Sequence, residues 1–248
     1  MDKGPHISIK PEAVFEVFGF PVTNSYLAAL IVITIFIFLS IYYSIQIKSL
    51  KRSSLFYLMQ YAVNSMYGFF KNVVGDKIEY LFPLLGSLFI YILLLNWFGL
   101  LPGVGSVLVK VKEGSQFGMV PFLRGNTSDL NTTLALAILA FTTIQYYGIK
   151  ELGIKGYFSK FINLSQPITL FTGVLEIISE FSRIVSFAFR LFGNIFAGEV
   201  IISIIAFLIP ILASFPFLLL EIFIGFIQAF VFSMLTAVFI NLAMAKQH

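Results

Sequence analysis

Long stretches without any charged side chain are the feature that most constrains this fold. Tyr26 to Ile47, Tyr80 to Leu100 and Leu130 to Ile149 contain no Asp, Glu, Lys or Arg. Each stretch is close to the ~20 residues that a helix needs to cross a bilayer. A further stretch, residues 161–245, is long enough for two such helices and carries charges only at intervals. The sequence therefore predicts an all-α polytopic membrane protein.

Composition excludes the main alternatives to a membrane protein. Of the 248 residues, 58% are hydrophobic and 11% are charged, which rules out a water-soluble enzyme, a disordered chain, collagen and a coiled coil. The chain has no cysteine, so disulfides, thiolate metal sites and thiol nucleophiles are excluded. Its net charge of +4 comes without basic clusters interleaved with aromatics, so nucleic acid is not an expected partner. Phosphate loops, catalytic triads and dinucleotide fingerprints are also absent from the sequence.

The chain is expected to form a single membrane domain with about five embedded helices. Residues 53–77 are predicted to form an additional helix at the membrane interface. Polar residues interrupt the apolar sequence there, while the apolar residues recur at helical spacing, which is an amphipathic pattern. Pro210 and Pro216 divide the last stretch into two long helices. The expected order is an outer surface segment (1–23), a first span (24–47), the interfacial helix (53–77), a second span (80–100), an outer loop (101–128), a third span (129–149) and a long helical hairpin (161–245).

The Lys and Arg residues of the connecting segments predict the orientation. One side would hold nine of them: Lys48, Lys51, Arg52, Lys71, Lys77, Lys150, Lys155, Lys160 and Lys246. The other side would hold five: Lys3, Lys10, Lys110, Lys112 and Arg124. Because the cytoplasmic side carries the excess of Lys and Arg, we expect the N-terminus outside and the C-terminus in the cytoplasm.

The final stretch carries ionisable side chains within the apolar sequence. An ionisable group in a bilayer costs roughly 3 kcal/mol on insertion scales, so each needs a partner or a role. Here they are Glu176, Glu180, Arg183, Arg190, Glu199 and Glu221. On a helix, seven polar residues step by three or four and form a stripe along one side: Glu176, Ser179, Glu180, Arg183, Ser186, Arg190 and Asn194.

Arg190 is the most informative of these charges. Glu180 and Arg183 are three residues apart, so they either neutralise each other as a structural pair or take part in ion transfer, and both interpretations remain open. Arg190 has no carboxylate three or four residues away, and an Arg keeps its charge at physiological pH. An isolated intramembrane cation whose partner lies elsewhere indicates a residue of an ion path.

The two long helices also predict a register. In an antiparallel hairpin, facing residues have a nearly constant sum of residue numbers. Arg190 with Gln228 and Glu199 with Glu221 satisfy this condition together, with a midpoint at Pro210. On this hypothesis Gln228 offers its amide to Arg190, while the two carboxylates share a site near the turn and can pass a proton between them. The alternative is that each carboxylate is separately hydrated at the outer interface.

The residues around Arg190 carry a family resemblance. The run FRLFGNIFAGE at Phe189 to Glu199 closely resembles the signature of subunit a of F-type ATP synthases. The runs QAFVFSMLTAVFI (228–240), SDLNTTLALA (128–137) and PVTNS (21–25) are similar to other parts of that subunit, so the resemblance covers nearly the whole chain. It implies that the last two helices form a tilted hairpin that curves around a rotor ring.

The resemblance implies roles for individual residues. Arg190 resembles the stator arginine that faces the carboxylates of the c-subunit ring, with Asn194 and Gln228 as polar companions. Glu199 and Glu221 resemble the ionisable pair of the outer half-channel, where many members carry one His. Asp129 and Asn131 resemble polar residues of the same entry path, although helix N-capping fits them equally well. Glu176, Ser179 and Ser186 fall where the family lines the inner half-channel.

The function implied is that of a non-catalytic stator subunit with two offset half-channels, through which protons reach and leave the ring. The implied partners are the c-subunit ring, b-type peripheral stalk subunits, the lipid bilayer and, indirectly, the F1 sector, with no cofactor and no metal. The length and the absence of a transit peptide favour a bacterial plasma membrane, and protons are favoured over sodium. A secondary carrier would show paired repeats and interrupted helices, which the sequence lacks. A purely structural anchor would tolerate neutral replacements of Arg190, Glu199 and Glu221.

Overall fold

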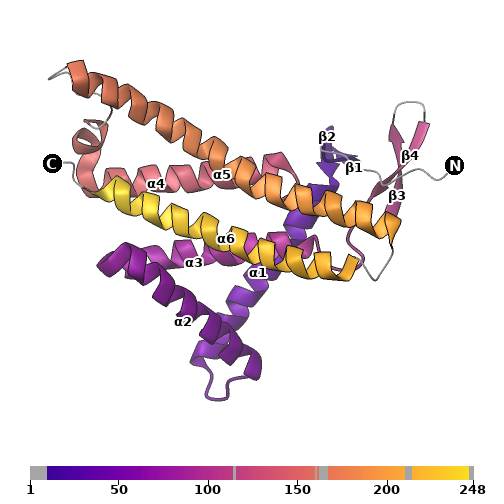
Figure 1. Cartoon of the computed structure of the whole chain (residues 1–248). Coiled ribbons are helices and arrows are strands. Elements are labelled where there is room, and N and C mark those ends of the chain that lie inside the picture. Colours follow the sequence, from indigo (N-terminus) through magenta and orange to yellow (C-terminus); the bar gives the residue numbers. More distant parts are fainter. Residues whose placement is uncertain (1–9, 114–115, 160, 162–166, 210–213, 246–248) are drawn as a thin grey trace.

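The protein is helical, with two small β-hairpins at one end. The computed structural model describes residues 10–113, 116–159, 161, 167–209 and 214–245. The elements, in order, are β1 (Ala13–Val17), β2 (Phe20–Thr23), α1 (Asn24–Lys48), α2 (Ser54–Val74), the 3-10 turn η1 (Gly75–Lys77), α3 (Ile78–Phe98), β3 (Leu108–Glu113), β4 (Gln116–Pro121), α4 (Leu130–Phe158), α5 (Pro167–Leu208) and α6 (Ser214–Met244). Both antiparallel hairpins lie at the end of the molecule where α5 and α6 are joined, hereafter the hairpin end (Figure 1).

The predicted all-α fold is confirmed. Among the described residues, five helical segments are long and apolar enough to cross a membrane: Asn24–Lys48, Ser54–Phe98, Leu130–Phe158, Leu170–Leu208 and Ser214–Met244. The second of these contains α2, η1 and α3, so the placement of α2 at the membrane interface remains a prediction. The expected outer loop differs from the prediction, because it contains the β3–β4 hairpin.

Side-chain caps define where three of the helices begin. Thr23 accepts a hydrogen bond from the backbone N–H of Tyr26 at the start of α1 (3.2 Å), and Ser53 accepts one from Phe56 at the start of α2 (3.3 Å). Asp129 caps α4 in the same way. These caps satisfy backbone donors that the first helical turn leaves without partners, and they fix the helix starts within the apolar sequence.

The antiparallel hairpin of α5 and α6 has the predicted register. The rings of Phe187 and Phe232 lie 4.9 Å apart, and Asn194 donates a hydrogen bond to Gln228 across 2.9 Å. Both pairs fit the register expected for Arg190 with Gln228. The predicted midpoint at Pro210 lies outside the described residues. Figure 1 shows α5 running obliquely over the other helices, as a tilted hairpin requires.

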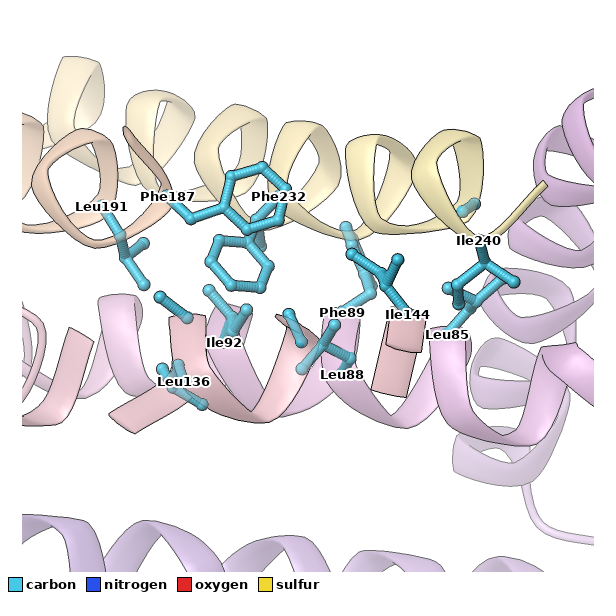
Figure 2. Packing of buried hydrophobic residues seen from close by; sticks show 14 of the residues in the cluster. Leu85, Leu88, Phe89, Ile92, Leu136, Ile144, Phe187, Leu191, Phe232 and Ile240 are labelled. Atoms are coloured by element: carbon cyan, nitrogen blue, oxygen red, sulfur yellow. The ribbon is translucent and has the colours of Figure 1, made fainter. Parts of the chain in front are cut away.

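The apolar core lies between α3, α4, α5 and α6. Its fully buried side chains come from all four helices, and Figure 2 shows them interdigitating: Leu85, Ile92, Ile144, Leu191 and Ile240. One face of α5 packs on the core, but α1 and α5 leave most of their surface open, since only 11% of the apolar window of α1 and 17% of that of α5 is buried. Apolar helix faces of this kind are covered by lipid or by other subunits in a membrane protein.

A break in α4 folds its last turn back onto the helix. Gly153 adopts φ 71°, a conformation that residues with a side chain rarely take. The turn that follows places Tyr157 against Gly148, where an added Cβ would lie 2.5 Å from the Tyr157 ring and 3.3 Å from Ala243. Tyr157 also donates a hydrogen bond to Gln145, so this packing holds a polar side chain in place.

Replacing Gly148 with Ala is therefore expected to destabilise the protein. Overpacking of this kind costs about 1–3 kcal/mol. The thermal unfolding midpoint of the purified, detergent-solubilised protein should fall measurably. Gly156→Ala on the same helix is the matched control, because a Cβ there meets only Leu152 at an ordinary 3.5 Å. Equal midpoints for the two variants would contradict the packing described for Tyr157.

Candidate functional site

The polar residues of α5 lie on two faces rather than one. Glu180 is buried between helices, whereas Ser179, Ser186, Arg190 and Asn194 are exposed on the side of α5 that the rest of the chain leaves open. The predicted single stripe is therefore wrong for Glu180, because its carboxylate turns towards α4. The exposed surface of α5 therefore carries these four polar side chains among apolar ones such as Val185 and Phe189.

Glu180 and Arg183 form the structural ion pair that was one of the two interpretations. Arg183 Nη1 lies 2.9 Å from Glu180 Oε1, and Gln145 on α4 donates a hydrogen bond to Glu180 Oε2, also at 2.9 Å. The Arg183 guanidinium stacks over the Phe239 ring of α6 at 3.9 Å. Three helices thus meet at one neutralised pair, which accounts for two of the six charges.

Arg190 lies on the exposed face of α5 without a carboxylate partner in the described part of the chain. Its Nη2 donates a long hydrogen bond (3.4 Å) to Ser186, one helical turn earlier. The expected contact with Gln228 exists, but at a different atom: Gln228 Nε2 donates to the backbone carbonyl of Arg190 at 2.6 Å. The Gln228 amide thus contacts Arg190 as expected, through the backbone, and the guanidinium is left open to a neighbouring molecule.

Asn194 completes this polar contact between the two helices. Its Nδ2 donates to Gln228 Oε1, so both ends of the Gln228 amide are held by α5. Gln228 itself is buried, with 4% of its surface exposed. The two hydrogen bonds restrain the position of α6 along the axis of α5, at the level of the Arg190 backbone. Within the described residues, Gln228 therefore contacts Asn194 and the Arg190 backbone, and the role of these two side chains in proton transfer remains a prediction.

The structure brings Glu199 and Glu221 together at one cavity of about 440 Å³, hereafter the hairpin-end cavity. Its wall is formed by the turn after α3, the loop before α4, and facing parts of α5 and α6. Glu221 is 4% exposed, and its Oε1 has no hydrogen-bond partner among the described residues. Its carboxylate lies against Gly198, the neighbour of Glu199. The two carboxylates thus line one cavity, in line with the expected register, and proton exchange between them remains a prediction.

Sequence reasoning missed two charged residues at this cavity, Arg124 and Glu12. The sequence suggests for Arg124 only a contribution to membrane orientation. Its Nε lies 3.5 Å from Glu199 Oε1, and only 8% of its side chain is exposed. Glu12, from the segment before β1, also lines the cavity. Arg124 lies in a loop and its partner Glu199 lies on α5, far along the sequence, so periodicity within one helix could not reveal the pair.

The remaining predicted residues lie outside the hairpin-end cavity. Asp129 caps α4 and accepts hydrogen bonds from the backbone N–H and the side chain of Asn131, at 2.9 and 3.1 Å. Their role in an entry path remains a prediction. Glu176 and Ser179 lie on α5 towards its N-terminus, on the other side of Arg190 from Glu199. In the described part of the chain, no cluster of three His, Asp or Glu side chains has an arrangement suited to a metal ion.

Comparison with known proteins identifies the family. The family model for the ATP synthase A chain matches residues 25–241, which is most of the chain. The chain belongs to the ATP synthase A chain family. The match includes every helix described above except the first residue of α1 and the last turn of α6. The resemblance inferred from the residues around Arg190 is therefore confirmed.

Individual relatives agree with this assignment. ATP synthase subunit a 2 of Bradyrhizobium sp. is 34% identical over 76% of this chain and 74% of its own length. ATP synthase subunit a of Gloeobacter violaceus is 36% identical over 74% of this chain and 68% of its own length. The chloroplastic subunit a of Stigeoclonium helveticum is 36% identical over 72% and 67%. Together with the apolar helices, these relatives make this A chain an integral membrane protein.

Proposed function

We propose that this A chain is the stator subunit that carries protons to and from the carboxylates of a rotating c-subunit ring. The observation that carries the proposal is the position of Arg190. It is an exposed guanidinium on an apolar membrane helix, without a carboxylate partner in the described residues, and polar groups lie on both sides of it along α5. A permanent charge there requires a partner on another molecule, because an unpaired charge in lipid is costly.

The hairpin-end cavity supports the first half of the path. It leads from the loops of the hairpin end to Glu199 and Glu221, with Asn96 also in its wall. Two carboxylates at one site can hold and exchange a proton, since both are rarely ionised together at short range. A proton entering here would pass from Glu199 to Glu221 and on to a ring carboxylate near Asn194, with Asp129 and Asn131 as further polar residues of the entry.

Arg190 would separate the two halves of the path. A ring carboxylate must be neutral while it faces lipid, because the ionised form is penalised by several kcal/mol. Beside Arg190 it can ionise, release its proton to one side and accept another from the other side. The fixed positive charge also opposes direct passage of a proton past α5. Rotation of the ring is then required for net transfer.

The second half would lie along the N-terminal part of α5. Glu176 is half-buried, and Ser179 and Ser186 are exposed on the same open face as Arg190. Their hydroxyl and carboxyl groups can exchange hydrogen bonds with water that reaches this face. This inner half-channel takes up protons released at Arg190. The Glu180–Arg183 pair closes the helix interface beside it.

The orientation and partners follow from the same proposal. The excess of Lys and Arg supports an N-terminus outside and a C-terminus in the cytoplasm, in a bacterial plasma membrane, which puts the hairpin end outside. The open face of α5 meets the c-subunit ring, other apolar faces meet lipid and b-type stalk subunits, and the F1 sector is coupled indirectly. Each proton crossing 100 mV delivers about 2.3 kcal/mol to rotation. This subunit makes no bond to nucleotide itself.

The proposed path is tested by neutralising Glu221 within the assembled complex. We expect Glu221→Gln to lower ATP-driven proton uptake into inverted membrane vesicles about fivefold, because Glu199 remains at the same site and retains part of the relay. Glu16→Gln is the matched control, since Glu16 is exposed on β1 and lines no part of the cavity. Normal uptake by Glu221→Gln, at normal assembly, would refute a path through this cavity.

A further inference from the structure

Arg124 is held by a tightly packed loop that precedes α4. Asn126, Thr127 and Ser128 are fully buried, and Ser128 Oγ donates a hydrogen bond to the Gly125 carbonyl at 2.8 Å. Gly125 packs against Gly99, where an added Cβ would come within 3.0 Å of the Gly125 Cα. Because this loop is tightly packed, the backbone from which the Arg124 side chain extends is held in one position.

The guanidinium of Arg124 connects two parts of the chain across the cavity mouth. Its Nη1 donates to the backbone carbonyl of Lys10 at 3.4 Å, and its Nε faces the Glu199 carboxylate at 3.5 Å. The Lys10 contact needs only an N–H donor, whereas the Glu199 contact depends on charge. These two contacts can therefore be separated by substitution.

The charges around the cavity explain why a cation is placed there. Three carboxylates line it, from Glu12, Glu199 and Glu221, and Arg124 is the one basic side chain among the described lining residues. The Glu199 side chain is 41% exposed, so without a partner its carboxylate could rotate away into water. The Arg124 side chain is nearly buried and cannot follow it, so the ion pair restrains Glu199 at the cavity wall.

We propose that Arg124 is a positioning residue for proton entry, which holds the Glu199 carboxylate at the wall of the hairpin-end cavity where it can pass a proton to Glu221. This inference rests on the proposed function, because it assigns Arg124 a part in the same path. Arg124 does not itself carry the proton, since its guanidinium stays protonated. Its effect is on the place and orientation of Glu199.

The test compares three variants of the assembled complex in inverted vesicles, each normalised to the amount of assembled chain. Arg124→Gln keeps a donor for the Lys10 carbonyl but removes the ion pair, and we expect ATP-driven proton uptake to fall about fivefold, the upper end for a partly exposed pair. Arg124→Lys keeps the charge and should restore most of the rate. Lys110→Gln is the control. Lys110 is another basic residue of the hairpin end, it is exposed on β3 and does not line the cavity, so its replacement should leave uptake unchanged.

A second test changes the other partner of the ion pair, Glu199, and leaves the loop that holds Arg124 unchanged. Glu199→Asp withdraws the carboxylate by one methylene and should lower uptake by a similar factor. Normal uptake by Arg124→Gln or by Glu199→Asp would overturn the proposal. An equal loss in Arg124→Gln and Arg124→Lys would also overturn it, because it would assign the effect to loop packing. Failure of the proposed function is distinguishable, because Glu199→Gln and Glu221→Gln would then both pump normally.

Discussion

Replacing Arg190 with Ala is expected to abolish ATP-driven proton uptake while the complex still assembles. The side chain is exposed on α5 and makes only a long hydrogen bond to Ser186 within the described chain, so its loss removes little packing. The backbone carbonyl that binds Gln228 is retained in the variant, and with it the contact between α5 and α6. What disappears is the fixed charge at which, in the proposed function, a ring carboxylate ionises.

The measurement is proton uptake by inverted vesicles, together with passive proton leak and the amount of assembled complex. Arg52→Ala is a suitable control, because Arg52 precedes α2 and stacks over Phe56, far along the chain from the polar face of α5. Increased leak in Arg190→Ala would agree with a charge that separates two half-channels. Near-normal uptake would refute the rotor-facing role and favour a purely structural membrane anchor.

The helical hairpin could be predicted in detail because its constraints are local and periodic. Two long apolar helices joined near Pro210 have one antiparallel register, and Asn194 with Gln228 and Phe187 with Phe232 now occupy it. The special position of Arg190 followed from its own neighbours, which are apolar and offer no countercharge. Both inferences needed only spacing along one helix or across one turn.

The features that could not be predicted depend on which face of a helix meets which neighbour. A helical stripe in sequence cannot show that Glu180 turns towards Gln145 on α4 while Ser186 stays exposed. Nor does the sequence place Arg124 beside Glu199, because the loop that does so is fixed by its packing on the turn after α3. From sequence alone, charged residues in the loops therefore indicate only the orientation of the chain in the membrane.

The β3–β4 hairpin had a signal that was not used. Val109 to Lys112 alternates apolar and charged residues, the period-two pattern of a half-exposed strand. Its position between two membrane spans and after Pro102 and two glycines favours a loop instead, which is the expectation that the hairpin replaces. Its position matters for function, since the backbone that continues from β4 leads directly to Arg124 and the cavity wall.

Gly198→Ala is expected to lower proton uptake by up to about fivefold, the loss expected for Glu221→Gln, without unfolding the helical hairpin. An added Cβ at Gly198 would overlap the Glu221 carboxylate. That carboxylate is the end of a flexible side chain, so it can move while the backbones of α5 and α6 keep their places. Because Glu221 is only 4% exposed, a displaced carboxylate leaves the shared site with Glu199 rather than shifting within open water. Misplacement of a reacting group slows its transfer step, and the loss is limited to that of Glu221→Gln because Glu199 remains at the site in both variants.

Two further variants decide whether the loss arises from this contact. Gly68→Ala on α2 is the matched control, since a Cβ there meets nothing within 4 Å, and its uptake should be unchanged. Adding Glu221→Asp to Gly198→Ala shortens the displaced side chain by one methylene and should recover part of the lost uptake, because the shorter carboxylate can return beside the new Cβ. No recovery in the double variant, with Glu221→Asp alone still active, would mean that the added methyl group acts through helix packing. The close approach of α5 to α6, and not the position of Glu221, would then be the reason that a glycine occupies this site.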